Sequence, residues 1–413
     1  MTRATTDYHL LVKPAGAACN LACQYCFFLS KENLYPGESH LMSEARLDRY
    51  LRQLFASSPG PDVHIAWQGG EPMLRGLDFF EKSVALAERY RKPHQRPVHS
   101  IQTNGTLIDD EWAAFFKRHD YLVGISLDGP RELHDAYRVD KRGRGSFDEV
   151  LRGWRILQRH EVEVNILCCV SAANGDHPKE VYRFFRDELG ARYIQPIPIV
   201  ERATEQTIAL ANRGWGGLKG SDRPLYKQEG SLVTKRSVGA EQFGRFLIGV
   251  FDEWVQGDIG RIFVTTFDVA LGSWLGSHNL CIFAPTCGRA PVLEHNGDLY
   301  SCDHYVEPDH RLGNIEHTTI AAMLASEQQR RFGDAKRDTL PRYCRECPVL
   351  FACHGECPRN RFIETPDGEA GLNYLCAGYK AFFEHIDAPM KAMADLLRRG
   401  RYADEYVHVR AAR

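Results

Sequence analysis

Short β-rich runs alternate with amphipathic helical patterns over about the first 200 residues, and this alternation constrains the fold more than any other feature. The β-rich runs lie at residues 8–13, 63–68, 98–102, 122–127, 164–170 and 193–197. Helical stripes lie between them: Leu47, Tyr50, Leu51, Leu54 and Phe55; Leu77, Phe80, Val84 and Ala87; and Phe147, Leu151, Trp154 and Leu157. The alternation predicts an α/β fold, with a parallel sheet and right-handed crossovers. Six strands fit an open or partial TIM-like barrel, (β/α)6, better than a closed eight-stranded one.

The regular pattern ends near residue 200. Residues 200–240 are rich in glycine, such as Gly220, and in basic residues, such as Lys219 and Arg223. This composition predicts a linker or lid. A helical pattern over 241–256 opens a second half, and the chain after Cys281 is rich in turns and cysteines. We therefore expect a partial barrel over 1–240, a small irregular metal-held domain over 241–385, and a C-terminal helix with a basic tail over 386–413.

Charge and hydropathy limit the expected partners. The 413 residues hold 52 Lys+Arg against 54 Asp+Glu, so a formal charge of -2 gives no reason to expect nucleic acid or a membrane surface. No apolar run approaches the roughly 20 residues of a membrane span, and the N-terminal region lacks the pattern of a secretory signal. We expect a cytoplasmic protein, and in that reducing compartment 13 clustered cysteines predict metal binding rather than disulfides.

Three cysteines lie together in the loop after the first strand. Cys19, Cys23 and Cys26 have the spacing Cys-x3-Cys-x2-Cys. Three close thiolates can hold three irons of a [4Fe–4S] cube and leave the fourth iron open for a ligand. The alternative is a zinc knuckle, but structural zinc takes four protein ligands and no fourth Cys or His follows in the loop.

The triplet, with the aromatic Tyr25 before its last cysteine, resembles the motif of the radical S-adenosylmethionine (SAM) superfamily. Residues 68–72, Gln-Gly-Gly-Glu-Pro, are similar to the family's GGEP loop, whose backbone receives the amino group of SAM. Polar strand ends follow at 102–105 and 126–130; taken singly, Asn104-Gly105 or Asp128-Gly129 would more often be a plain turn. The resemblance implies SAM as a cofactor, in contact with Tyr25, Gln68, Gly69, Gly70, Glu71, Gln102, Asn104, Ser126 and Arg138. Gln68, Gln102 and Ser126 could contact the target peptide instead, and an arginine on a helix face, such as Arg138, is usually just solvated.

Eight more cysteines lie in the second half, as many as two four-ligand sites use. Cys344-x2-Cys347-x5-Cys353-x3-Cys357, followed by Cys376, resembles the SPASM domain, an auxiliary-cluster module found after radical SAM barrels in peptide-modifying enzymes. The family's interleaving implies one auxiliary [4Fe–4S] cluster on Cys281, Cys287, Cys302 and Cys357, and another on Cys344, Cys347, Cys353 and Cys376. With the triplet, three [4Fe–4S] clusters are expected. A zinc site over 344–357 stays open on spacing alone, and Cys168 and Cys169 are expected to be buried strand thiols that bind no metal.

Within the superfamily, the chain resembles anaerobic sulfatase-maturating enzymes over nearly its full length. The run from Cys302 to Ile315, Cys-Asp-His-Tyr-Val-Glu-Pro-Asp-His-Arg-Leu-Gly-Asn-Ile, is its most specific part. The resemblance implies oxidation of a Cys or Ser side chain of a sulfatase to Cα-formylglycine. A 5'-deoxyadenosyl radical takes a Cβ hydrogen, a carboxylate removes the thiol or hydroxyl proton, and an electron leaves toward the auxiliary clusters. The matching carboxylate is Asp303, whose alternative role is a turn aspartate that caps backbone amides. Relatives commonly have Tyr where Phe28 stands, so Phe28 is not assigned to the site.

The expected substrate is an unfolded sulfatase or a peptide with the motif Cys/Ser-x-Pro/Ala-x-Arg. A reducing donor such as flavodoxin or ferredoxin is also implied. Two alternatives stay open. One is another SPASM enzyme that forms a thioether or carbon–carbon crosslink in a peptide; such enzymes often carry a leader-peptide-binding domain, and no domain-sized segment precedes Cys19. The other is a zinc-held binding module without catalysis.

Overall fold

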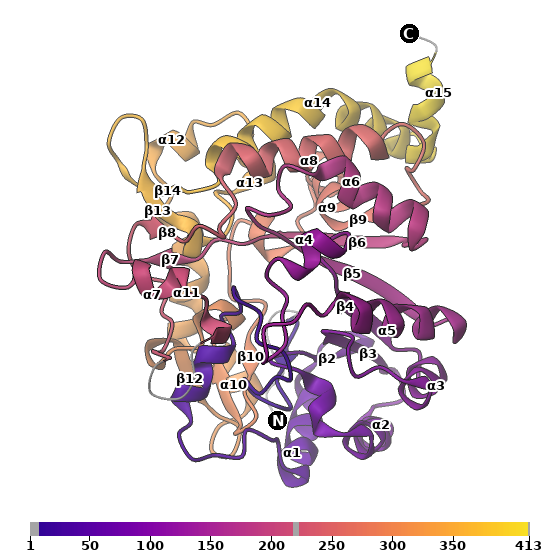
Figure 1. The fold of residues 1–413 in the computed structure, drawn as a ribbon, viewed down its shortest axis with the longest axis vertical. Helices are drawn as coiled ribbons and strands as arrows, with labels where there is room; N and C mark the ends of the chain where they lie inside the picture. The colour runs from indigo at the N-terminus through magenta and orange to yellow at the C-terminus, as the bar shows by residue number, and fades with distance from the viewer. Residues whose placement is uncertain (1–7, 218–222, 412–413) are drawn as a thin grey trace.

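A ten-stranded sheet forms the centre of the computed structural model, which describes residues 8–217 and 223–411 (Figure 1). The strand order is β12-β11-β10-β1-β2-β3-β4-β5-β6-β9, and β1 to β6 run parallel in chain order. These six strands are β1 (Leu11–Val12), β2 (Asp62–Trp67), β3 (Arg96–Thr103), β4 (Leu122–Ser126), β5 (Glu163–Val170) and β6 (Tyr193–Pro198). The predicted α/β fold with an open parallel sheet is confirmed.

Helices connect the parallel strands: α1 (Glu44–Ser57), α2 (Leu77–Tyr90), α3 (Asp110–Arg118), α4 (Arg131–Asp135), α5 (Phe147–Arg159) and α6 (Pro178–Arg183). Helix α1 begins after Ser43, whose hydroxyl accepts the Arg46 N–H, and it buries all five residues of the predicted stripe. The stripe of α2 differs from the prediction because Phe79 and Leu86 are buried while Leu77 and Val84 are only half-buried. The core therefore contacts a wider face of α2 than the spacing of the four predicted residues indicates.

The second half of the chain adds strands to both edges of this sheet. Strand β9 (Phe263–Val264) pairs with β6, and β10 (Val292–Leu293) pairs with β1, both in parallel. Strands β11 (Asp298–Tyr300) and β12 (Arg311–Asn314) continue the β10 edge in antiparallel order. The sheet thus runs across the boundary expected at residue 240, and the division into 1–240, 241–385 and 386–413 stays a prediction.

Two helices pack side by side at one end of the molecule (Figure 1). Helix α8 (Ala240–Trp254) matches the pattern expected over 241–256, and α14 (Cys376–Arg398) begins earlier than the helix predicted from residue 386. The reason is local: the Asn373 side chain accepts the Leu375 N–H, and buried apolar side chains already follow helical spacing from Tyr379 onward. The helices cross closely at Gly244 and Gly378, where a Cβ on Gly244 would lie 2.6 Å from the Gly378 Cα. Helix α15 (Tyr406–Ala411) follows in the basic end of the chain.

The segment over 200–240 is folded, in the part that the structure describes, against loops at the carboxyl ends of the strands. It contains β7 (Arg202–Ala203), α7 (Ile208–Asn212) and β8 (Leu232–Val233), and its small core holds Ala203, Ala211, Trp215 and Tyr226. The buried Glu201 carboxylate pairs with Arg236 at 3.0 Å and accepts the Trp215 indole N–H at 2.8 Å. Lys219 and Gly220, part of the predicted linker or lid, lie outside the described residues.

The remaining elements are short and surround the C-terminal cysteines. They are α9 (Thr265–Trp274), α10 (Ile320–Leu324), α11 (Glu327–Asp338), α12 (Arg342–Arg345), α13 (Leu350–Cys353), β13 (Arg361–Glu364) and β14 (Ala370–Asn373). Across residues 8–217 and 223–411, no helix has the length and apolar character needed to cross a bilayer.

Candidate functional site

One cavity opens at the carboxyl ends of the parallel strands and encloses about 1170 Å³ of empty space, mouth included. That is room for a ligand of cofactor size. Its wall brings together almost every residue that the sequence assigns to this end of the molecule: Cys19, Cys23, Tyr25, Cys26, Gln68, Gly69, Gly70, Gln102, Asn104, Ser126, Arg138 and Asp303. Among those predicted contacts, Glu71 alone is not part of the described wall.

The loop with the cysteine triplet is held by backbone hydrogen bonds outside the cysteines. Ala22 N–H donates to Val139 O at 2.8 Å, and Gln24 N–H donates to Tyr137 O at 2.9 Å. On the other side, Trp215 N–H donates to Gln24 O at 2.9 Å. The loop is therefore fixed between the segment after α4 and the segment over 200–240.

The three thiols fit a positively charged occupant. Burial raises the pKa of the Cys23 thiol to about 12, although the neighbouring Arg138 guanidinium opposes this rise. Burial also raises the pKa of Cys19 and of Cys26. Buried thiols with raised pKa values need a bound cation to become thiolates, and iron supplies that charge.

Gly69 and Gly70 allow two backbones to meet. Gly70 N–H donates to Gly16 O at 2.9 Å, and a Cβ at Gly70 would lie 2.1 Å from Ala18 O. Gly69 has φ +119°, a conformation that L side chains rarely adopt. This close contact joins the end of β2 to the chain just before the cysteine loop. The contact of the Gly69 and Gly70 backbone with SAM stays a prediction.

The Glu71 side chain lies behind the cavity wall. Its carboxylate accepts hydrogen bonds from the Asn104 N–H at 2.8 Å, the Thr103 hydroxyl at 2.8 Å and the Met73 N–H at 3.1 Å. Burial raises its pKa to about 7, against the effect of these three hydrogen bonds. The carboxylate joins the ends of β2 and β3, so the structure gives it a scaffolding contact where the sequence predicts a contact with a cofactor.

Arg138 belongs to a buried charge cluster that the sequence did not reveal. Its Nε donates to Asp128 Oδ2 at 2.8 Å, and the Tyr25 hydroxyl donates to the same oxygen at 2.6 Å. The other oxygen, Oδ1, accepts the Cys169 N–H at 2.9 Å. Arg138 is only 6% exposed, so the alternative of a solvated arginine does not hold. Asp128 was hidden in a turn-like Asp-Gly-Pro run, which gives no sign of burial.

Polar strand ends complete the wall near the triplet. Gln102 Nε2 donates to Ser126 Oγ at 3.1 Å, and Asn104 Nδ2 donates to Asn20 Oδ1 at 2.8 Å and to Cys19 Sγ at 3.6 Å. Cys168 and Cys169 are both buried, as expected, and Cys169 also lines the cavity.

Asp303 enters the cavity from the C-terminal half, at the start of the short helix η7 (Asp303–Tyr305). Its Oδ2 accepts a hydrogen bond from Gln68 Nε2 at 2.9 Å, and its Oδ1 lies 2.9 Å from Lys13 Nζ. Lys13 also donates to Glu294 Oε1 at 2.9 Å. The partners of Asp303 are thus side chains that follow β1 and β2, rather than the amides of its own turn as the alternative requires.

The sequence analysis missed Lys13 and Glu294. Burial lowers the pKa of Lys13, but Asp303 and Glu294 outweigh that effect and the pKa is raised. The sequence feature that could have revealed Lys13 is its position directly after the apolar run Leu10-Leu11-Val12, where a buried strand ends. The Phe28 ring lies 4.6 Å from this ammonium group.

His304 and Arg359 are two further residues of the wall that the sequence analysis missed. His304 Nδ1 lies 2.9 Å from Arg359 Nη1. Burial, and then the charge of Arg359, lowers the pKa of His304 well below its usual value. A neutral imidazole that accepts a hydrogen bond from the guanidinium explains this contact.

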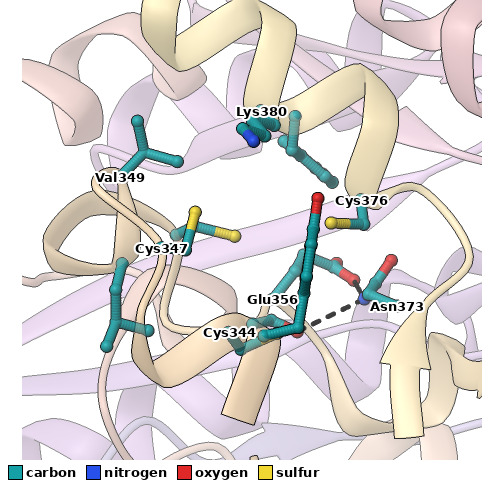
Figure 2. A pocket seen from close by; sticks show the side chains of 12 residues that line it. Cys344, Cys347, Val349, Glu356, Asn373, Cys376 and Lys380 are labelled. Carbon is teal, nitrogen blue, oxygen red and sulfur yellow. Dashed lines mark hydrogen bonds between the residues drawn. The ribbon is translucent and has the colours of Figure 1, made fainter. Parts of the chain in front are cut away.

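A small pocket, with about 410 Å³ of empty space when its mouth is included, lies in the C-terminal half and is lined by Cys344, Cys347, Cys353 and Cys376 (Figure 2). Figure 2 shows Cys347 and Cys376 on opposite sides of it. Burial, followed by the charges of Cys376 and Cys344, raises the pKa of Cys353 to about 12. These are the four cysteines that the resemblance assigns to one auxiliary cluster.

The other four cysteines also lie together. Burial and then Cys357 raise the pKa of Cys302 well above its usual value, with a smaller effect from Cys281. Cys287 likewise has its pKa raised by burial and by Cys281. The Lys336 ammonium donates to the carbonyls of Cys281 and Ile282 at 2.6 and 2.8 Å.

Both groups of C-terminal cysteines are suited to bind a [4Fe–4S] cluster. In the part of the chain that the structure describes, no three Cys, His, Asp or Glu side chains converge closely enough to hold a single metal ion. The four thiolates of a cube bind four different irons, so they require a wider arrangement. As in the triplet, the buried thiols have raised pKa values and need the positive charge of bound iron to become thiolates.

Two family models match the chain. The model of the radical SAM superfamily matches residues 14–185, and that of an iron–sulfur cluster-binding domain, SPASM, matches residues 281–348. The first match contains the triplet and the ends of β2 to β5 that line the large cavity, but not the end of β6. The second contains Asp303 but ends before Cys353, Cys357 and Cys376.

Characterised relatives are similar along most of the chain. A serine-type anaerobic sulfatase-maturating enzyme of Bacteroides thetaiotaomicron is 44% identical over 390 residues, 93% of this chain and 91% of the relative. A cysteine-type anaerobic sulfatase-maturating enzyme of Clostridium perfringens is 32% identical over 380 residues, 91% of this chain and 95% of the relative.

Solved structures agree with this similarity. Native anSMEcpe with bound AdoMet superimposes with a TM-score of 0.79 at 31% identity, covering 94% of this chain and 99% of that one. Native anSMEcpe with bound AdoMet and the Kp18Cys peptide gives a TM-score of 0.79 at 31% identity, with coverage of 94% and 98%.

Proposed function

The chain belongs to the family of anaerobic sulfatase-maturating enzymes of the radical SAM superfamily, and we propose that it oxidises a Cys or Ser side chain of a sulfatase to Cα-formylglycine. Its similarity to both serine-type and cysteine-type relatives supports the reaction and leaves the choice of target residue to experiment. The observation that carries the proposal is the position of Asp303 in the same cavity wall as the cysteine triplet, where Gln68 and the buried Lys13 contact its carboxylate.

Cys19, Cys23 and Cys26 would hold one [4Fe–4S] cluster, and the polar strand ends around them would hold SAM. When bound, this pair supplies the one-electron chemistry that removes a hydrogen atom from the target Cβ. Asn104 and the Tyr25–Asp128–Arg138 cluster keep the wall around the triplet in shape.

Asp303 would accept the proton of the target thiol or hydroxyl. The target loses a hydrogen atom from Cβ, a proton from sulfur or oxygen, and one electron. Serine then gives the aldehyde directly, whereas cysteine gives a thioaldehyde that water hydrolyses with release of hydrogen sulfide. Gln68 and Lys13 orient the carboxylate in this role, because each contacts one of its oxygens.

The electron would leave toward the C-terminal half. Cys281, Cys287, Cys302 and Cys357 would hold the auxiliary cluster next to Asp303, which directly follows Cys302 in the chain. Cys344, Cys347, Cys353 and Cys376 would hold the other, giving three clusters and about twelve irons per chain. A small reducing protein such as flavodoxin or ferredoxin would supply the electron that starts each turnover.

The substrate would be an extended segment with the motif Cys/Ser-x-Pro/Ala-x-Arg, because a side chain can reach the strand ends only on a flexible chain. Residues after β6 and in the 200–240 segment, including Val200, Tyr226 and Gln228, form the side of the cavity that would contact it. A formal charge of -2 leaves capture to such local contacts rather than to long-range steering.

The test compares peptides and folded protein under identical anaerobic conditions. Reduced enzyme and SAM are incubated with Ser- and Cys-containing motif peptides deuterated at Cβ, and with prefolded sulfatase. We expect an aldehyde in at least one peptide, deuterium in 5'-deoxyadenosine, and no reaction of the folded sulfatase. A crosslinked peptide without aldehyde would favour the alternative SPASM chemistry.

A further inference from the structure

A single turn joins the two groups of auxiliary cysteines. Cys353 lines the cavity with Cys344, Cys347 and Cys376, whereas Cys357 lies with the other group. The residues between them, His354, Gly355 and Glu356, all have positive φ, at 46°, 69° and 50°. Only glycine adopts this conformation readily, and it is strained for the two non-glycine residues. The turn must therefore be held by its surroundings.

Arg361 at the start of β13 holds this turn by its carbonyls. Its Nε donates to Gly355 O at 2.9 Å, and its Nη2 donates to His354 O at 2.9 Å and to Glu356 O at 3.2 Å. The remaining nitrogen, Nη1, donates to Lys336 O in α11 at 2.6 Å. The planar fork of a guanidinium suits this contact with several carbonyls at once, and a lysine could not reproduce it.

The opposite side of the turn is braced by amides. The Glu356 side chain is buried, and its carboxylate accepts hydrogen bonds from Asn373 Nδ2 at 2.7 Å and Asn360 Nδ2 at 3.1 Å. On the side that faces Arg361, a Cβ on Gly355 would lie 2.7 Å from Arg361 Nη2, so that side of the turn has no spare room. The relative position of Cys353 and Cys357 is thus set by side chains that are not themselves cluster ligands.

The Arg361 guanidinium contacts the turn between Cys353 and Cys357, so its charge lies next to one cysteine of each group. Burial lowers the pKa of Arg361, and thiols from both groups oppose this, first Cys344 and then Cys287. Lys336 differs, because the cysteines that act on its pKa, Cys287, Cys357 and Cys281, all belong to one group. A partly buried cation is weakly screened, so its field acts on both sites.

We propose that Arg361 is a positioning residue of the auxiliary electron route: it fixes the turn between the two sites and stabilises the reduced state of the cluster in each. The inference rests on the proposed function, in which both groups hold a [4Fe–4S] cluster. A reduced cluster carries one more negative charge than the oxidised cluster, so a nearby cation raises its reduction potential.

The experiment measures iron content and the midpoint potentials of all clusters by redox titration followed by electron paramagnetic resonance. For Arg361→Met, we expect the ratio of reduced to oxidised auxiliary cluster at a fixed potential to fall about tenfold in both sites, ~59 mV for a one-electron couple. The cluster on the triplet should keep its potential. Arg361→Lys keeps the charge, so its potentials should stay near those of the wild type.

The matched control is Arg342→Met, which removes an exposed cation close to Cys344 in the sequence whose side chain pairs with Asp367. It should leave all potentials unchanged. If Arg361→Met does not retain its auxiliary clusters, Arg361→Gln, which keeps a hydrogen-bond donor without the charge, carries the same expectation.

Unchanged auxiliary potentials in an iron-replete Arg361→Met or Arg361→Gln variant would overturn the inference, and so would a shift confined to one site. An equal shift in Arg361→Lys would also overturn it. Failure of the underlying function gives a different result, because wild-type protein would then hold only about four irons per chain.

Discussion

The two cysteine-rich regions of this molecule are built in opposite ways. The triplet occupies one short loop, which is attached to a sheet and helices with a large apolar core, to which parts of the second region such as Phe283 and Val349 also contribute. The other eight cysteines are spread over residues 281–376, among short helices and turns with a small apolar cluster around Leu340, Cys344 and Leu372. The first region is a loop on a scaffold, whereas in the second the ligand-bearing segments are themselves much of the scaffold. Loss of the cluster should therefore abolish catalysis in the first region, whereas in the second region it should destabilise the fold.

Removing the triplet should have the largest effect on activity. Replacing Cys19, Cys23 and Cys26 together by Ala should abolish SAM cleavage and remove about one third of the iron, since one cube of three is lost. The protein should stay soluble because the loop is also held by backbone bonds at Ala22, Gln24 and Trp215 that do not involve the thiols. Iron analysis and detection of 5'-deoxyadenosine check this, and SAM cleavage by the variant would refute the assignment.

Asp303→Asn tests the one residue that the second region contributes to the chemistry of the first. The variant should fold and cleave SAM, but peptide oxidation should fall by about 10²–10⁴-fold, the range of general-base contributions. Asn keeps one oxygen that can accept the Gln68 hydrogen bond, and Glu294 still pairs with Lys13 when the Asp303 charge is lost, so the fold should be retained. Aldehyde formed per 5'-deoxyadenosine is the measurement, and an unchanged ratio would return Asp303 to a structural role.

Cys347→Ala should damage folding where the triplet variant does not. Cys347 lines the small cavity with three other cysteines, and the loss of one ligand removes binding free energy that stabilises the surrounding turns. We expect less soluble protein, about one third less iron and lower activity. A soluble variant with full iron content would contradict both the ligand assignment and the contrast drawn here.

Gly70→Ala should give the smallest effect of the four and should be confined to the first region. Its Cβ would lie 2.1 Å from Ala18 O, so the two backbones must separate. We expect a loss of about 1–3 kcal/mol in the free energy of unfolding, typical of overpacking, and weaker SAM cleavage with intact auxiliary clusters. Gly60→Ala is the control, since nothing lies within 4 Å of a Cβ there. Equal effects of the two substitutions would show that the contact at Gly70 carries no special weight.

The six parallel strands could be predicted from the sequence because each carries its own local pattern. The run expected at 63–68, for example, is β2 (Asp62–Trp67) in the structure. Strands β9 and β10 could not be predicted in this way, since each has two residues and pairs with a strand far away in the chain. The early start of α14 could have been predicted from Tyr379 onward, where apolar side chains follow helical spacing; only the first residues of the helix, next to the Asn373 contact, leave no periodic signal.

The site shows the same division. Cysteines, glycines and polar strand ends lie in recognisable local runs, so the wall of the large cavity could be largely anticipated. Lys13 could not, because its partners Glu294 and Asp303 are close only in the folded chain. Glu71 lay within a matching motif, yet the direction of its side chain depends on donors from β3 that the motif does not contain.

The pairing of β1 with β10 has a consequence for how the chain is synthesised. Leu11 N–H donates to Pro291 O at 3.0 Å and Lys13 N–H to Leu293 O at 2.9 Å, so one side of β1 is satisfied only by residues made about 280 positions later. At typical translation rates of 5–20 residues per second, this side of the strand stays an open edge for roughly 15–60 s. During that time its unpaired backbone groups can pair with another nascent chain. Lys13, later the partner of Asp303, ends that apolar edge with a charge, as natural sheets do at edges they must keep from aggregating.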